Sequence, residues 1–183
     1  MPQKRAKVLA SRVIYAGRVF GVRSERVVEP GGVTVTRDVV THNGSVVLLP
    51  VFPDGRILLV RQYRHAVGKH LWELVAGRIE PSEPPLPAAR RELLEETGYT
   101  ARRFVKLLDV FPTPGYVSER MLVYLVEGLT AGASRPEAYE RITSSRFTPA
   151  QLERMMRRGV LRDGKSIAGI LYYLRFQRRR RGR

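Results

Sequence analysis

Carboxylate side chains are concentrated in one stretch of this chain, GRIEPSEPPLPAARRELLEETGY, which spans residues 77–99. Within it, Glu92 and Glu96 are four residues apart, so on a helix they stack along one side, with Glu95 one turn from Glu92. Carboxylates this close repel one another unless cations lie between them. Their hard oxygen atoms suit Mg²⁺ or Mn²⁺, and these ions suit phosphate chemistry. The alternative is a solvated acidic helix face paired with arginines, and the helix alone does not separate the two.

A helix is predicted around these residues, over about 86–97. Helix-forming residues fill this range, and Gly98 follows it where a helix commonly ends. Arg91 can pair with Glu95 one turn later, which would hold that carboxylate in place. One stripe of the helix is expected to face the core, and it consists of Leu86, Ala89, Leu93 and Thr97.

The same stretch has a fixed order of glycine, arginine and glutamate: Gly77, five residues, Glu83, seven residues, Arg91-Glu92-Leu93, one residue, Glu95-Glu96, one residue, Gly98-Tyr99. In this order it resembles the Nudix box and matches every fixed position of that family's pattern. Tyr99 is a soft departure, because an aliphatic residue is usual there. The resemblance implies that Glu83 supports the loop before the helix or reaches a metal through water.

Further segments extend the resemblance to nearly the whole chain, over about 15–174. They are similar to the ADP-ribose pyrophosphatase branch of that family: VRQYR (60–64), WELVAGRIE (72–80), PTPGYVSER (112–120) and LRDGKSIAG (161–169). In that branch a proline follows the box at a distance that Pro114 matches. Two departures are small, since Val75 stands where a proline is common and Ser82 where a glycine often precedes the glutamate.

This resemblance implies an α/β (α+β) fold, a Nudix-type α/β/α sandwich with a mixed sheet, preceded by an N-terminal antiparallel β-segment. It also implies a site for Mg²⁺, or for Mn²⁺. By motif position, Glu92 and Glu96 are the main metal ligands, and Ala76 offers its backbone carbonyl. Glu95 shares in metal binding or pairs with Arg91 to hold the helix in register.

The general base is assigned more loosely. In this branch a glutamate on a loop before a late strand positions the attacking water. The corresponding loop here offers Glu137 and Glu140, and Glu140 is the better matched, ahead of Arg141 and Ile142. The alternatives are that both are surface glutamates near arginines, or that a metal hydroxide needs no protein base.

Substrate binding is assigned by resemblance to several segments. Arg64 and Arg37 stand where the branch has arginines near the phosphates or the partner subunit, and Glu73 stands near the ribose or adenine side. Phe20 can stack on adenine, because an aromatic face needs little specificity. The alternatives are plain surface arginines and an aromatic side chain that fills the β-core. The full predicted set is Phe20, Arg37, Arg64, Glu73, Pro114 and Gly115.

The implied activity is Mg²⁺-dependent hydrolysis of the diphosphate link of ADP-ribose to AMP and ribose 5-phosphate. One alternative is a Nudix enzyme of broader range, acting on other nucleoside-diphosphate sugars or on RNA 5′ ends. The PTPGYVSER segment disfavours hydrolysis of RNA ends. The other is a non-catalytic Nudix-fold binding module, which the intact Glu92, Glu95 and Glu96 argue against. Members of the branch are commonly homodimers whose N-terminal β-segment crosses to the partner, so a homodimer is expected.

The chain that must position these residues has 183 residues, 43% of them hydrophobic, which suits one domain with a small appendage. It has no cysteine, which excludes disulfides and thiolate metal sites. The longest apolar stretch, VVLLPVF, is too short to span a bilayer, and the start resembles no secretory signal, so a cytoplasmic protein without membrane contact is expected.

The net charge of +16 owes much to the C-terminal tail, RFQRRRRGR. This tail is read as a solvated terminus, with loose contact to nucleic acid as the less favoured alternative.

Three segments are expected: an N-terminal β-segment (1–42), a Nudix hydrolase domain (43–177) and a basic tail (178–183). Valine-rich runs predict an antiparallel meander over 8–14, 18–28 and 33–42. The runs VVLLPVF and RILLVRQY predict a hairpin around Pro53-Asp54-Gly55. The later elements expected are strands at 104–111, at 120–127 and near Ile142, and helices at about 149–158 and 165–177.

Overall fold

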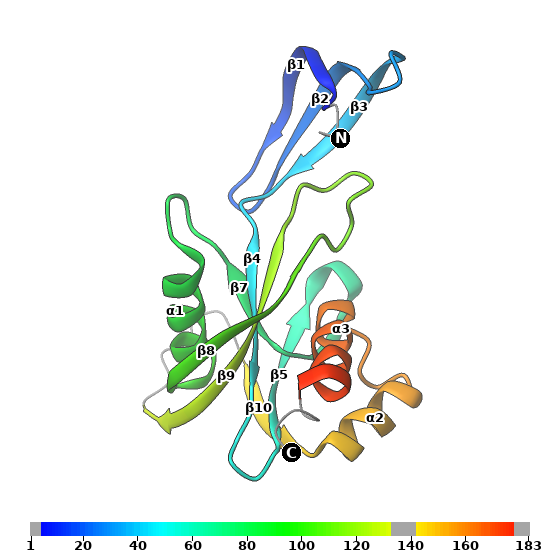
Figure 1. The fold of residues 1–183 in the computed structure, drawn as a ribbon. Coiled ribbons are helices and arrows are strands. Elements are labelled where there is room, and N and C mark those ends of the chain that lie inside the picture. Colours follow the sequence, from blue (N-terminus) through cyan, green and yellow to red (C-terminus); the bar gives the residue numbers. More distant parts are fainter. Residues whose placement is uncertain (1–4, 133–141, 178–183) are drawn as a thin grey trace. The chain divides into compact units, whose positions relative to one another are not determined.

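The computed structural model describes residues 5–132 and 142–177 and contains two compact units (Figure 1). The first unit takes its residues from Met1–Gly44 and Phe111–Arg120, and the second from Ser45–Val110 and Met121–Arg183. The loop 111–120 therefore groups with the N-terminal strands rather than with the strands that it connects. The basic tail and both candidate bases, Glu137 and Glu140, lie outside the described residues.

The first unit is a three-stranded antiparallel sheet, in the order β1 (Lys7–Ala16), β2 (Gly21–Val28), β3 (Thr34–Thr41). This confirms the predicted meander. The β2–β3 turn closes through Gly32, whose φ of 86° is left-handed and so favours glycine. The loop 111–120 extends the sheet at its β3 edge, since the Val40 N–H donates to the Tyr116 carbonyl at 2.8 Å.

The second unit is built on a four-stranded sheet in the order β7 (Val75–Arg78), β4 (Ser45–Pro50), β9 (Met121–Ala131), β8 (Tyr99–Val110). Strand β4 runs parallel to β9, whereas the other neighbours are antiparallel, so the sheet is mixed as predicted. A smaller antiparallel sheet has the order β10 (Thr143–Phe147), β5 (Ile57–Arg64), β6 (Lys69–Glu73).

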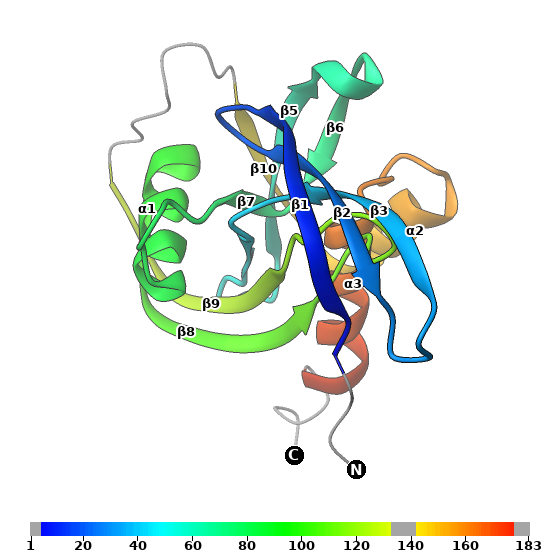
Figure 2. The same ribbon diagram turned by 90° about the horizontal axis from the view of Figure 1, so that it is seen from above.

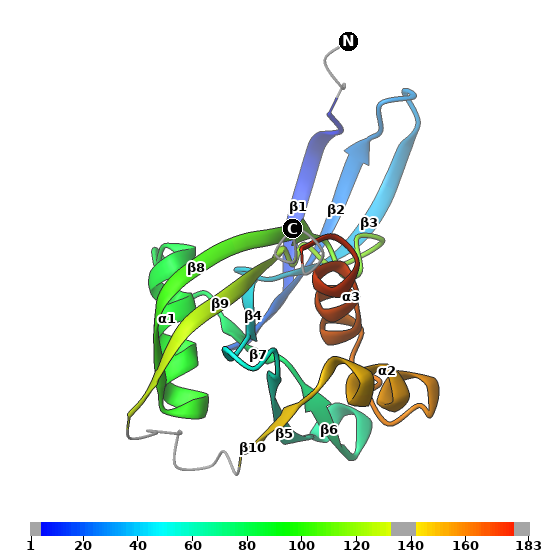
Figure 3. The same ribbon diagram turned by 60° about the horizontal axis from the view of Figure 1, so that its bottom comes forward.

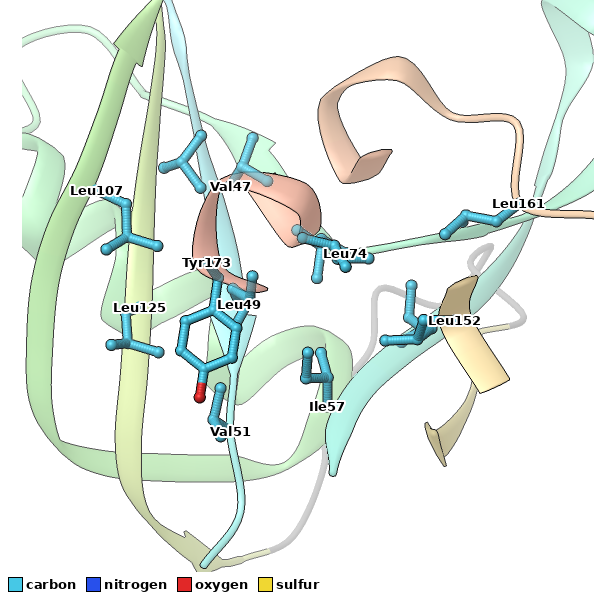
Figure 4. Close-up of a cluster of buried hydrophobic side chains, with 13 residues drawn as sticks. Val47, Leu49, Val51, Ile57, Leu74, Leu107, Leu125, Leu152, Leu161 and Tyr173 are labelled. Atoms are coloured by element: carbon cyan, nitrogen blue, oxygen red, sulfur yellow. The ribbon is translucent and has the colours of Figure 1, made fainter. Parts of the chain in front are cut away.

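Helices α1 (Pro85–Thr97) and α3 (Gly164–Tyr172) cover opposite faces of the four-stranded sheet (Figures 2 and 3). Side chains alternate along a strand, so each face of β4 contributes to its own core. Val46 and Leu48 pack in a cluster with Ala89 and Leu93 of α1. Val47 and Leu49 pack in a second cluster with Ile170 and Tyr173, and Figure 4 shows Leu49 beside Tyr173. The predicted α/β/α sandwich is therefore confirmed.

Helix α1 has the predicted position, and its end at Gly98 is a left-handed cap with φ 72° whose N–H donates to the Leu94 carbonyl. The predicted core stripe is wrong at Leu86, which is 40% exposed. Leu86 belongs to the first turn of the helix, and the first residue of α1 in the buried cluster is Ala88.

The predicted β4–β5 hairpin is wrong, although its turn is present. The Phe52 N–H donates to the Arg56 carbonyl at 2.9 Å, and an isolated bridge joins Val51 to Ile57. Beyond this bridge the two strands enter different sheets, because both edges of β4 are already paired, to β7 and to β9.

The remaining helices follow their predicted ranges. Helix α2 (Pro149–Arg157) begins with a capping box between Thr148 and Gln151. Helix α3 begins at the N-cap Asp163 and continues as a π-helical turn, η2 (Tyr173–Gln177). A short 3₁₀ turn, η1 (His65–Val67), joins β5 to β6. In the ranges 5–132 and 142–177, no helix is both long and apolar enough to cross a membrane.

Candidate active site

The site is built on the strand–loop–helix unit formed by β7, residues 79–84 and α1. At its centre the carboxylate of Glu92 lies against the backbone of Gly77. A Cβ atom built at Gly77 would lie 1.9 Å from Cδ of Glu92, far inside van der Waals contact. Glycine at position 77 is therefore what allows this carboxylate to reach the backbone of strand β7.

Arg91 is the cation that ties the carboxylates together. Its Nε and Nη2 donate to the two oxygens of Glu83 at 3.0 and 2.9 Å, a bidentate arrangement. Its Nη1 donates to Glu92 at 2.6 Å and to Glu95 at 3.0 Å, so the predicted Arg91–Glu95 pair is present. Nη2 also donates to the carbonyl of Arg78 at 3.0 Å. One guanidinium thus joins the strand end, the loop and the helix.

The pKa values follow from this geometry. The hydrogen bonds to Glu83 raise the pKa of Arg91, against the opposing effect of burial, so its charge is fixed. In turn, the hydrogen bonds from Arg91 lower the pKa of Glu83, although partial burial acts to raise it. Glu83 is therefore a carboxylate throughout the neutral range.

The loop before α1 is closed by the same glutamate. The Glu80 N–H donates to Oε2 of Glu83 at 3.0 Å, and the Glu83 N–H donates back to the Glu80 carbonyl at 3.0 Å. Between them, Ser82 has a left-handed φ of 64°, a conformation that glycine adopts without steric cost. This explains why a glycine is common at that position and shows that serine is accommodated there.

The donor set fits a hard divalent cation. Glu92 and Glu96 supply carboxylate oxygens on α1, and Glu92 lies at the backbone next to Ala76. Oε2 of Glu96 is buried and accepts no hydrogen bond from the described residues, while the residue as a whole has other interactions. In the described ranges no three acidic or histidine side chains converge as a metal-binding group. Here Arg91 supplies the positive charge that Glu92 and Glu95 share.

A second charged cluster lies at the ends of β5 and β6. Arg64 donates from Nε and Nη2 to the two oxygens of Glu73, both at 2.8 Å. Glu73 is only 1% exposed and also accepts a hydrogen bond from Lys165 of α3. Burial acts to raise the pKa of Glu73, but the hydrogen bonds and charges of Arg64 and Lys165 outweigh it, so the pKa lies below its ordinary value.

The two clusters are electrostatically connected. The hydrogen bond with Glu73 is the main cause of the raised pKa of Arg64, and Glu96 is among the further carboxylates that raise it. Arg64 and Glu96 of helix α1 are therefore within electrostatic range of each other. The sequence predicts Arg64 and Glu73 as two separate substrate-binding residues, whereas the structure joins them as an ion pair.

The other predicted substrate residues belong to the first unit. Arg37 donates from Nε to Glu29 at 3.0 Å, and the ring of Phe20 lies 5.5 Å from that of Tyr15. Pro114 and Gly115 are exposed residues of the loop 111–120. Their roles in binding stay predictions.

Sequence reasoning missed Lys165, which contacts Glu73 from α3. It also missed Asp163 and Ser166 at the start of the same helix, which are hydrogen-bonded to each other. The segment LRDGKSIAG contains all of them, and its similarity to the branch assigns no role to any of its residues. The signal in the sequence was an aspartate suited to a helix N-cap, closely followed by a lysine and a serine, which places these polar side chains together at the start of one helix.

Comparison with known proteins is consistent with this geometry. The NUDIX domain family matches residues 41–168. ADP-ribose pyrophosphatase of Mycobacterium tuberculosis (strain ATCC 25618 / H37Rv) is 37% identical over 175 residues, which cover 93% of this chain and 84% of the relative. ADP-ribose pyrophosphatase of Bacillus subtilis (strain 168) is 35% identical over 140 residues, 76% of each chain. A GDP-mannose pyrophosphatase of Escherichia coli O1:K1 / APEC is 30% identical over 141 residues, 72% of this chain and 73% of the relative.

Solved structures agree on the fold. The crystal structure of an ADP compounds hydrolase has a TM-score of 0.84 to this chain and covers 98% of both chains, at 20% sequence identity. With the family match over most of the chain, the glutamate-rich helix against Gly77 and the sandwich that holds it, the protein belongs to the NUDIX family.

Proposed function

We propose that this protein hydrolyses the diphosphate link of ADP-ribose, giving AMP and ribose 5-phosphate. The observation that carries the proposal is the carboxylate edge of α1, with Glu92 against Gly77 and Arg91 holding the strand, loop and helix together. The relatives named ADP-ribose pyrophosphatase support the choice of substrate.

The carboxylates of Glu92 and Glu96, with the carbonyl of Ala76, would hold Mg²⁺ or Mn²⁺ at this edge. When bound, such a cation neutralises the diphosphate and makes water a better nucleophile at neutral pH. Arg91 keeps the helix in register with strand β7 and the loop, so that the ligand oxygens stay in place.

Substrate orientation is proposed to come from Arg64. A guanidinium has five N–H donors in a rigid fork, and two of its groups, Nε and Nη2, are directed at Glu73. The Arg64 side chain is 41% exposed, so a phosphate from solvent can reach donors that Glu73 does not occupy. Glu140, or Glu137, remains our proposal for positioning the attacking water, on the basis of the sequence.

The test is replacement of each main ligand by its neutral isostere. Glu92→Gln and Glu96→Gln keep the shape of the side chain but remove a charged ligand, so kcat with Mg²⁺ should fall by roughly 10²-fold or more. Glu153→Gln is the matched control, because Glu153 is an exposed glutamate on α2. Near-normal turnover by both ligand variants would contradict the assignment.

The substrate is tested on a panel of ADP-ribose, GDP-mannose and a short 5′-capped RNA, with products separated by chromatography. We expect ADP-ribose to have the highest kcat/KM, with the RNA poor despite the basic tail. A preference for the RNA would reject the proposed substrate, and no hydrolysis of any member would favour the binding module. We further propose that the protein acts in the cytoplasm, as a homodimer whose contacts involve strand β1.

A further inference from the structure

The cluster around Glu73 joins three elements through a closed set of hydrogen bonds. Lys165 donates from Nζ both to Oε2 of Glu73 and to Oδ1 of Asp163, the latter at 2.9 Å. Asp163 accepts from the Ser166 N–H at 3.0 Å, and the Ser166 hydroxyl accepts from the N–H of Leu74 at 2.7 Å. Leu74 directly follows Glu73, so the circuit returns to its starting point.

The charges in this cluster balance only when Lys165 is included. Arg64 and Lys165 carry two positive charges, and Glu73 and Asp163 carry two negative ones. Asp163 is also the N-cap of α3, where the helix dipole favours a negative charge. Without Lys165, Arg64 would face two carboxylates alone, and the cluster would carry a net negative charge beside a site for an anionic diphosphate.

We propose that Lys165 is a positioning residue that anchors the buried carboxylate of Glu73. Through Glu73 it holds the Arg64 guanidinium in one orientation, ready to receive the substrate's phosphates, and its positive charge keeps the cluster neutral. Lys165 and Asp163 are each about 15% exposed at the side chain, against 41% for Arg64. Lys165 therefore acts from a more buried position, through Glu73, whereas the more exposed Arg64 is the residue that would contact the ligand. This inference rests on the proposed function only in taking a nucleoside diphosphate as the ligand.

The test compares Lys165→Met with Lys165→Arg. Loss of the charge in Lys165→Met should raise KM for ADP-ribose about tenfold while kcat changes by less than about threefold, because an attraction present in both ground and transition states is lost. The Kd for ADP, measured by calorimetry, should rise by a similar factor. Lys165→Arg restores the charge and should return both constants to within about threefold of the parent protein.

Two further variants make the result specific. Lys106→Met removes an exposed lysine that pairs with Asp109 on β8, and it should leave KM and Kd unchanged. Lys165→Gln serves as a second neutral variant if the methionine impairs folding, and the melting temperature of each variant is recorded.

The outcomes separate this inference from the proposed function. If the parent protein hydrolyses ADP-ribose but Lys165→Met and Lys165→Gln leave KM and the Kd for ADP unchanged, the positioning role is wrong. It is equally wrong if both variants lose kcat and melting temperature together and arginine does not restore them. If the parent protein hydrolyses no member of the panel, the proposed function fails, and the Kd for ADP alone decides the role of Lys165.

Discussion

Gly77 shows how a single missing side chain lets the Glu92 carboxylate reach the backbone of strand β7. The atom that a Cβ at this position would meet is Cδ of Glu92, the end of a flexible side chain rather than backbone. A methyl group there would therefore displace the carboxylate without disturbing strand β7. Glycine is therefore required at position 77 by the geometry of the site and not by the stability of the fold.

This predicts that Gly77→Ala is folded but nearly inactive. Because Glu92 must move by about an ångström or more, we expect kcat to fall by roughly 10²-fold, with little change in melting temperature. Gly31→Ala is the control, since a Cβ there meets no atom within 4 Å. Steady-state kinetics and thermal unfolding measure both quantities, and an active Gly77→Ala would show that Glu92 is not held as the structure has it.

At the scale of elements, the buried Glu73 connects β5, β6 and α3 through Arg64 and Lys165. A buried carboxylate whose partners are both cations stabilises the fold only while it is charged. Its pKa in the folded protein is lowered, so this stability is present above the unfolded value of about 4.3 and is lost as the pH falls through the folded value.

The sign of this effect gives a pH prediction. Glu73→Gln should reduce the free energy of unfolding by about 3 kcal/mol at pH 7, because Arg64 and Lys165 lose the charge of their buried partner. The difference from the parent protein should narrow as the pH falls below the unfolded value of about 4.3 and through the lower pKa of Glu73 in the folded protein, where the parent also loses that charge. Urea unfolding across this range provides the measurement, with Glu29→Gln, from the exposed pair with Arg37, as the control. A difference that is constant with pH would mean that Glu73 does not titrate as the structure indicates.

The elements differ in how far the sequence could predict them. Helix α1 and its end at Gly98 depend on local signals, and the structure has both. The β4–β5 pairing failed because a turn such as Pro53-Asp54-Gly55 fixes only a change of direction, whereas the partners of β4 come from distant segments. Lys165 was missed for the same reason, since it lies 92 residues from Glu73 and no local pattern links the two.

At the scale of the whole molecule, strand β1 stands out because it is an edge strand that exposes apolar side chains. It pairs with β2 on one side, and all ten of its residues are exposed. Val8, Val13 and Ile14 are at least 50% exposed, with Val13 at 63%. A long apolar edge strand left open invites pairing with another chain, and natural proteins normally cover or charge such edges.

We therefore expect a homodimer that covers β1, and the variant Val13→Lys should weaken it. A charge on the exposed edge disfavours strand pairing and apolar contact, so light scattering at micromolar concentration should show a dimer for the parent protein and mostly monomer for the variant. Val160→Lys is the matched control, because Val160 is half exposed in the segment between α2 and α3. If the partner completes the site, activity per chain should fall on dilution through the dimer dissociation constant, as mass action requires. A parent protein that is monomeric and fully active at micromolar concentration would reject the dimer, and β1 would then need another partner.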